Sequence, residues 1–115
     1  MNIVKEQADA YHAHIYFNQE TRDRAWSLRE KINEKFAQAK VGRFFEKEIG
    51  PHPRWSCQIA FEGALFPAFV PWLMLNRDGL TIFLHAETGD HLADHTEYAI
   101  WMCEMLPLKL EIFQS

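Results

Sequence analysis

The stretch YHAHIYF, residues 11–17, alternates in the way that is typical of a β-strand. The side chains that suit a core all fall on one face of that strand: Tyr11, Ala13, Ile15 and Phe17. His12 and His14 fall together on the other face, where a strand buried on both sides would carry aliphatic residues. The stretch therefore predicts a strand with a hydrophobic core on one side and two imidazoles on the other.

The sequence after this strand predicts a helix and then two antiparallel strands. Apolar residues recur at spacings of three and four among charged ones, which predicts an amphipathic helix from about residue 19 to 39 with Asn18 as its N-cap. GRFFEKEI, residues 42–49, and RWSCQIAF, residues 54–61, read as two strands. The proline-rich turn GPHP between them carries His52.

The second half predicts another helix, a strand and a third helix. GALFPAFVPWLMLN, residues 63–76, is apolar all round and predicts a helix bent at Pro71. GLTIFLHA, residues 79–86, predicts a strand that ends near His85. Asp94 and Glu97 resemble a capping box, so we expect a third helix over about 95–105. The tail LKLEIF, residues 108–113, alternates like an edge strand or an arm that contacts a partner subunit.

The order βαββαβ followed by a helix predicts an α+β fold of the ferredoxin-like type, in which an antiparallel sheet has its helices on one face. With 115 residues, 48% of them hydrophobic, we expect a single domain spanning residues 1–115. The first and last strands are neighbours in such a sheet. His12 and His14 would then point from its open face.

Composition excludes several classes of partner. A formal charge of −4 and a pI near 5.8 disfavour nucleic acid and anionic membranes as partners. We expect no signal peptide, because residues 1–10 have no apolar core, and no membrane span, because the longest apolar run is interrupted by Pro67 and Pro71. Cys57 and Cys103 read as reduced, apolar residues. We therefore expect a cytoplasmic protein.

Four histidines, His12, His14, His52 and His85, lie on or beside predicted strands, and the topology allows them to meet. Neutral imidazole is a good ligand for iron, zinc and copper, and ligands from several strands can hold one ion without a CxxC or HExxH motif. Two histidines in alternation are also typical of a half-exposed polar strand face. Composition alone leaves the reaction open.

Taken together, YHAHIYF, GPHP and FLHAETGDHLADHT followed by IWM resemble the small DOPA 4,5-dioxygenase family of fungi and bacteria. The resemblance covers about residues 10–104, with the three motifs in the expected order. One departure is Ala86, where the family usually has proline. The resemblance implies an oxidoreductase that binds a small catechol and O2. It would open the ring of a catechol such as DOPA at a non-haem Fe(II), although a purified protein could carry zinc or another divalent metal.

Carried over by position, the resemblance makes His12, His14, His52 and His85 catalytic residues. We expect His14, His52 and His85 to bind the metal, with His12 as a ligand or proton-transfer partner. His91 and His95 would belong to the start of the third helix. The candidate carboxylate ligands are Glu46, Glu48 and Asp90, of which Asp90 more simply caps a turn.

Arg54 or Arg43 could bind a substrate carboxylate, and Trp55 could stack on the catechol ring, while Trp72 and Trp101 would be core residues.

Two other functions fit the same residues. The chain could be a non-catalytic ferredoxin-like dimer that binds a small aromatic ligand or a metal, or a metal-independent monooxygenase of the dimeric α+β barrel type. We expect a homodimer in either the enzyme or the binding protein, because two open sheet faces would bury apolar surface against each other. Turnover separates an enzyme from a binding protein, and activity after exhaustive chelation would favour the monooxygenase.

Overall fold

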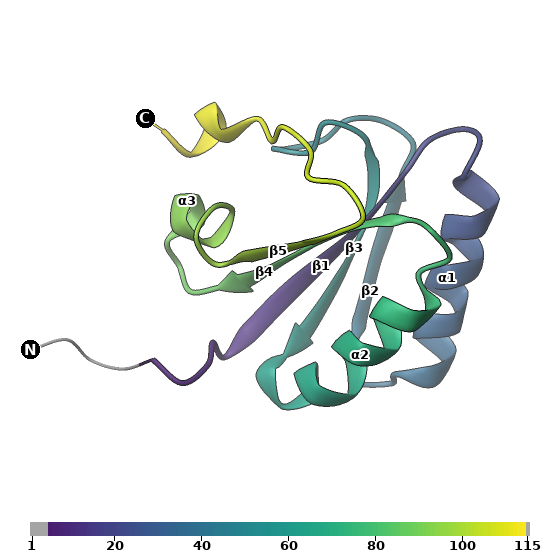
Figure 1. Ribbon diagram of the computed structural model, residues 1–115, viewed down its shortest axis with the longest axis horizontal. Helices are drawn as coiled ribbons and strands as arrows, with labels where there is room; N and C mark the ends of the chain where they lie inside the picture. Colours follow the sequence, from purple (N-terminus) through teal and green to yellow (C-terminus); the bar gives the residue numbers. More distant parts are fainter. Residues whose placement is uncertain (1–4, 115) are drawn as a thin grey trace, which may run out of the picture.

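The computed structural model describes residues 5–114 (Figure 1). The elements follow in chain order: β1 (Ala10–Phe17), α1 (Arg22–Lys35), β2 (Lys40–Phe45), β3 (Trp55–Glu62), η1 (Gly63–Leu65), α2 (Phe66–Asn76), β4 (Thr81–Glu87), α3 (His91–Asp94), β5 (Ala99–Met102) and η2 (Leu110–Phe113). None of the helices in residues 5–114 combines the length and apolar character that crossing a bilayer requires.

The sheet is antiparallel with strand order β2-β3-β1-β4-β5. The first four strands have the ferredoxin-like arrangement that the sequence predicts, and β5 extends the sheet beyond β4. The long helices α1 and α2 lie on the same side of the sheet (Figure 1). The α+β, ferredoxin-like prediction is therefore confirmed.

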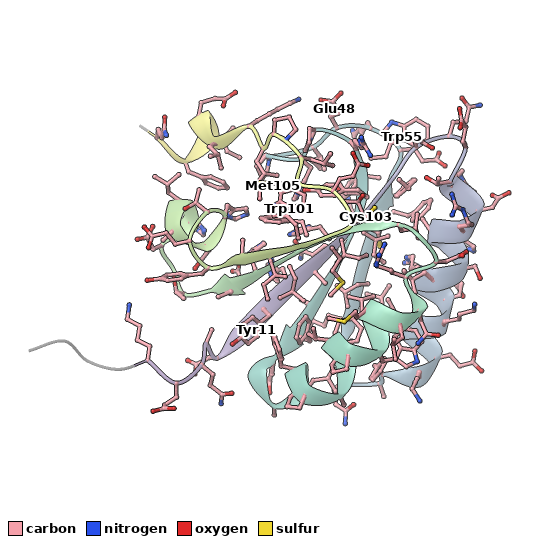
Figure 2. All side chains as sticks on the ribbon, in the orientation of Figure 1. Tyr11, Glu48, Trp55, Trp101, Cys103 and Met105 are labelled. Carbon is pink, nitrogen blue, oxygen red and sulfur yellow. The ribbon has the colours of Figure 1, made fainter. Side chains whose placement is uncertain are left out.

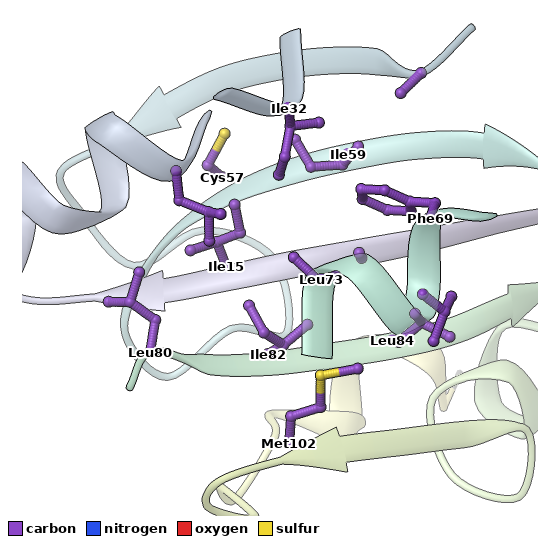
Figure 3. Close-up of a cluster of buried hydrophobic side chains, with 14 of the residues drawn as sticks. Ile15, Ile32, Cys57, Ile59, Phe69, Leu73, Leu80, Ile82, Leu84 and Met102 are labelled. Atoms are coloured by element: carbon purple, nitrogen blue, oxygen red, sulfur yellow. The ribbon is translucent and has the colours of Figure 1, made fainter. Parts of the chain in front are cut away.

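The main core lies between the sheet and these two helices. Alternate residues of the strands point into it, including Ile15, Ile59 and Ile82, and they meet Ile32 of α1 and Leu73 of α2 (Figure 3). All five side chains are fully buried. The predicted apolar face of the first strand is thus the face that packs on the helices.

The two cysteines are free, as the sequence predicts. Cys57 is buried on the helix side of β3, and burial raises the pKa of its thiol to about 11. Cys103 is exposed. Neither residue contributes to a metal site in the described chain, because the one clustered group of potential ligands consists of histidines.

The prediction of a helix over 95–105 is wrong. Ala99–Met102 is the edge strand β5, which pairs with β4 so that Ile82 faces Met102 across the ladder. Strand pairing overrides the local helical pattern here. A single helical turn, α3, precedes the strand, and the tail forms the short 3-10 helix η2 where we expected an edge strand or arm.

The expected capping box is also wrong, because Asp94 lies at the end of the short helix α3. Asp90 caps that helix instead, and its carboxylate accepts a hydrogen bond from the backbone N–H of Ala93 at 3.1 Å. Asp94 is fully buried and accepts hydrogen bonds from Thr88, at 2.9 Å from the backbone N–H and 2.6 Å from the hydroxyl.

The observed start of the first helix and the observed end of the second strand also differ from the predicted ones. α1 begins at Arg22, and Asn18 closes the preceding turn through reciprocal hydrogen bonds with Thr21. The second strand ends at Phe45, so residues 46–54 form a longer loop than GPHP alone. α2 continues through Pro71.

The histidine face of the sheet is not open. The backbone N–H of Lys109 in the tail donates to the carbonyl of Pro51 in the 46–54 loop at 2.8 Å, which joins the two segments. His14, His52 and His85 are buried beneath this side of the molecule. The broad exposed sheet face on which we based the dimer prediction is therefore absent.

Candidate metal centre

The sheet register brings histidines from β1 and β4 together. His12 of β1 lies directly opposite His85 of β4, and His14 is two residues along the same face. The Nε2 atoms of His14 and His85 are 3.0 Å apart. One ring nitrogen from each of His12, His14 and His85 lies within 4.8 Å of the others, and this is the one such cluster of potential ligands within residues 5–114.

This spacing fits a bound metal ion. Two nitrogens that bind one ion at about 2.1 Å and at right angles lie about 3 Å apart. His85 Nδ1 donates to the carbonyl of Ala86 at 2.9 Å, which leaves the lone pair of His85 Nε2 directed at His14. The Glu87 carboxylate lies 3.4 Å from His12 Nδ1 and 3.7 Å from His85 Nδ1, where it can orient both rings.

Burial keeps the imidazoles neutral. Desolvation lowers the pKa of His14 well below 6.5, and the neighbouring histidines lower it further. Desolvation also lowers the pKa of His85 to about 4 and that of the more exposed His12 by less. Because a metal binds the unprotonated ring, these nitrogens are ready to bind an ion at neutral pH.

His52 lies beside the cluster, next to His14. Its ring lies 4.2 Å from the ring of His14 between centroids, but it is not part of the three-histidine cluster. Its Nδ1 is 2.6 Å from the hydroxyl of Tyr16. Burial raises the pKa of the Tyr16 hydroxyl and lowers that of His52 to about 4, so both groups are uncharged, and which of them donates depends on which ring nitrogen of His52 carries the proton.

Sequence reasoning missed the position of His95. Its ring lies over that of His85, with centroids 4.1 Å apart, and its Nδ1 donates to the carbonyl of His91 at 2.7 Å. We expected both residues at the start of a long helix and did not place His95 among the site residues. The sequence feature that bears on this position is the HLADH spacing, since His95 follows the exposed His91 by one turn of helix.

The three candidate carboxylate ligands lie away from the cluster. Glu46 forms an ion pair with Arg22, and Glu48 forms one with Lys109 on the surface (Figure 2). Asp90 caps α3. None of the three carboxylates is therefore placed to complete the histidine group.

The two predicted substrate-binding residues are also placed elsewhere. Arg54 forms an exposed ion pair with Glu104 at 3.3 Å. Trp55 lies on the helix face of the sheet and packs edge-on against Phe17 (Figure 2). Trp101, which we expected in the core, packs against a second, smaller core on the histidine face (Figure 2).

A small second core supports that face. Trp101 stacks at 4.4 Å on Phe83 and at 6.0 Å on Tyr16, with Leu106 of the tail packed alongside. A cavity of about 190 Å³ lies beneath the 46–54 loop, and its lining includes His14 and His52. The histidines thus have a rigid aromatic support on one side and empty space on the other.

Comparison with known proteins gives a family match, a similar crystal structure and two curated relatives. A model of the Dopa 4,5-dioxygenase family matches residues 11–112. The crystal structure of a proposed dioxygenase from Nostoc punctiforme superposes with a TM-score of 0.93 at 42% identity and covers 98% of this chain and 97% of that one.

Two curated relatives are fungal. An uncharacterized 21.2 kDa protein of Botryotinia fuckeliana is 38% identical over 90% of this chain, and a DOPA 4,5-dioxygenase of Amanita muscaria is 29% identical over 94%. The chain spans 62% and 51% of the lengths of these two relatives.

Proposed function

This chain belongs to the Dopa 4,5-dioxygenase family, and from that premise we propose that it cleaves DOPA or a related small catechol with O2 at a histidine-bound Fe(II). The observation that carries the proposal is the convergence of His12, His14 and His85 nitrogens within 4.8 Å. In this extradiol reaction the C–C bond beside the diol breaks and both atoms of O2 enter the product. The catechol supplies the electrons, so no further reductant is needed.

His12, His14 and His85 would hold the iron, which supplies a centre where catechol and O2 can bind side by side. We propose this set in place of the His14, His52 and His85 set expected from the motifs, because these are the three residues whose nitrogens converge within 4.8 Å. Glu87 orients the His12 and His85 rings from outside the ligand set. The neutral state of all three imidazoles favours binding at pH 7.

His52 is the proposed acid–base residue. When its Nδ1–H donates to the Tyr16 hydroxyl, its Nε2 has a free lone pair, and its ring lies against His14 at the edge of the cavity. His52 can then take a proton from a substrate hydroxyl at Nε2 and, as the imidazolium, give it back, a role worth about 10²–10⁴ in rate. His95 covers His85 from the opposite side and helps to exclude water from the cluster.

An oxygen-uptake assay tests the proposal. The chelated protein is reconstituted with Fe(II) without air, and catechols are then added in aerated buffer at pH 7.5. We expect one O2 consumed per catechol and a coloured ring-opened product. His14→Ala abolishes both, while His91→Ala, a matched change at an exposed histidine outside the cluster, retains them.

Two results would contradict the proposal. No oxygen uptake with any member of a catechol panel would reject ring cleavage, and binding that saturates once per subunit without turnover would favour the alternative of a ligand-binding protein. Equal loss of activity in the His14 and His91 variants would show that the cluster has no special part in the reaction.

A further inference from the structure

One row of side chains crosses the sheet from its edge to the histidine cluster. Lys40 of β2 is paired with Ala60 of β3, Ala60 with His12 of β1, and His12 with His85 of β4. Residues paired in this way point to the same face. Lys40 is therefore two strands from His12, about 10 Å between backbones, with only a methyl group between them.

A cavity of about 210 Å³ occupies this part of the face, and its lining includes His12, Lys40, Ala60 and Glu62. Glu62 is paired with Ala10 and so points to the same side as His12. Lys40 and Glu62 are exposed, and neither forms an ion pair within the described residues.

The cavity is also where solvent reaches the cluster. The side chain of His12 is 24% exposed, whereas His14 and His85 are 3% and 1% exposed as residues. The 46–54 loop covers the other end of β3, over Ser56. A substrate that approaches the cluster through the opening at His12 passes over Ala60, next to Lys40.

We propose that Lys40 binds the carboxylate of an arm carried by the catechol ring, and that Glu62 beside it favours an ammonium group on the same arm. The inference rests on the proposed function. With the diol at the histidine cluster, the arm extends across Ala60, whose short side chain leaves room for it, to the unpaired charges at the sheet edge. The site then selects a catechol with a zwitterionic amino-acid arm over neutral or purely anionic catechols.

The cation predicted from the sequence and the cavity on the other side of the cluster offer no alternative. Arg54 is held by Glu104 on the surface, and the cavity at His14 and His52 has no Lys or Arg in its lining. An ammonium ion at the end of a lysine side chain can reach several ångströms over Ala60, and the partly desolvated cavity strengthens its attraction for a carboxylate.

Selectivity among three catechols tests the pair. The kcat/KM values for DOPA, 3-(3,4-dihydroxyphenyl)propionate and 4-methylcatechol are measured with the iron-loaded wild type and with Lys40→Met and Glu62→Gln. We expect Lys40→Met to lower the preference for both carboxylates over 4-methylcatechol about tenfold, mainly through KM. Glu62→Gln lowers the preference for DOPA over the propionate about threefold. Lys31→Met and Glu34→Gln, exposed positions on α1, leave both ratios unchanged.

A second readout is independent of turnover. In the zinc-loaded protein, the backbone amide NMR signals of Lys40 and Ala60 should shift with the propionate and much less with 4-methylcatechol. Unchanged selectivity ratios in Lys40→Met, or equal amide shifts for both ligands, would overturn the inference. Failure of the wild type to cleave even 4-methylcatechol would reject the proposed function instead, and the amide shifts would then decide on Lys40 alone.

Discussion

Acid should destabilise the metal-free protein through its buried histidines. Burial lowers the pKa of His52 and of His85 to about 4, against an ordinary value of 6.5 in the unfolded chain. Above pH 6.5 both states are neutral and these groups do not affect stability. Between pH 6.5 and 4 the unfolded chain binds protons that the folded chain excludes, so the free energy of unfolding falls as the pH falls.

The size of the effect follows from the two pKa values. pH 5 lies about 1.5 units below the pKa of a histidine in the unfolded chain. Over that range each pH unit lowers the free energy of unfolding by about 1.4 kcal/mol for each histidine that stays neutral in the folded chain. Each residue therefore costs about 2 kcal/mol, and His52 and His85 together up to about 4 kcal/mol. Since domains of this size have a total stability of about 5–15 kcal/mol, the loss is large.

Urea unfolding of chelated protein at pH 7 and pH 5, followed by tryptophan fluorescence, measures this loss. His52→Asn removes one titrating group and should reduce the acid-induced loss by about 2 kcal/mol. His91→Asn, at an exposed position, should lose as much stability as the wild type. Equal free energies of unfolding at the two pH values, or a full loss in His52→Asn, would refute the argument that desolvation holds these rings neutral.

Three further predictions test the site and the core. Zinc at 100 times its Kd should add about 2.7 kcal/mol to the free energy of unfolding, and thermal melts should show no such gain in His12→Ala but a full one in His91→Ala. Tyr16→Phe should leave zinc affinity intact and lower kcat about 10²-fold, because the proton of His52 is no longer held on Nδ1 and Nε2 is no longer kept free as the base; parallel losses of affinity and kcat would count against this role. Leu73→Ala, fully buried between α2 and the sheet, should cost about 2–5 kcal/mol in urea unfolding, and a loss below about 1 kcal/mol would contradict the packing described.

The sequence was sufficient for the first four strands of the sheet and for the grouping of His12, His14 and His85. Alternation around Ile15 sets which face of β1 meets the helices, and the other face then carries His12 and His14. The ferredoxin-like order places β4 beside β1, which brings His85 to them. These inferences succeeded because a two-residue period and a strand order suffice to define which side chains share a face.

The features that depend on long loops and on contacts of the tail could not be predicted from the sequence in this way. No local pattern pairs His52 with Tyr16, because the bond depends on how the 46–54 loop folds back over the sheet. The segment Ala99–Met102 has an apolar pattern that suits either a helix or a short edge strand, and pairing with β4 decides between them. His95 was misplaced for the same reason, since its position depends on a single helical turn that ends before β5.

The burial that destabilises the folded chain in acid is also what prepares the proposed site. An imidazole that remained half-exposed would keep its ordinary pKa, and at neutral pH part of its population would be protonated and unable to bind a metal. In this fold the central strand β1 places His14 under the loop and the tail, so desolvation keeps its lone pair available. His12, at the open end of the same row, is less buried and has a smaller shift of its pKa. The change in burial from His14 to His12 therefore runs along β1 from the protected end of the cluster to its entrance, and Lys40 lies level with His12, two strands across the sheet from it.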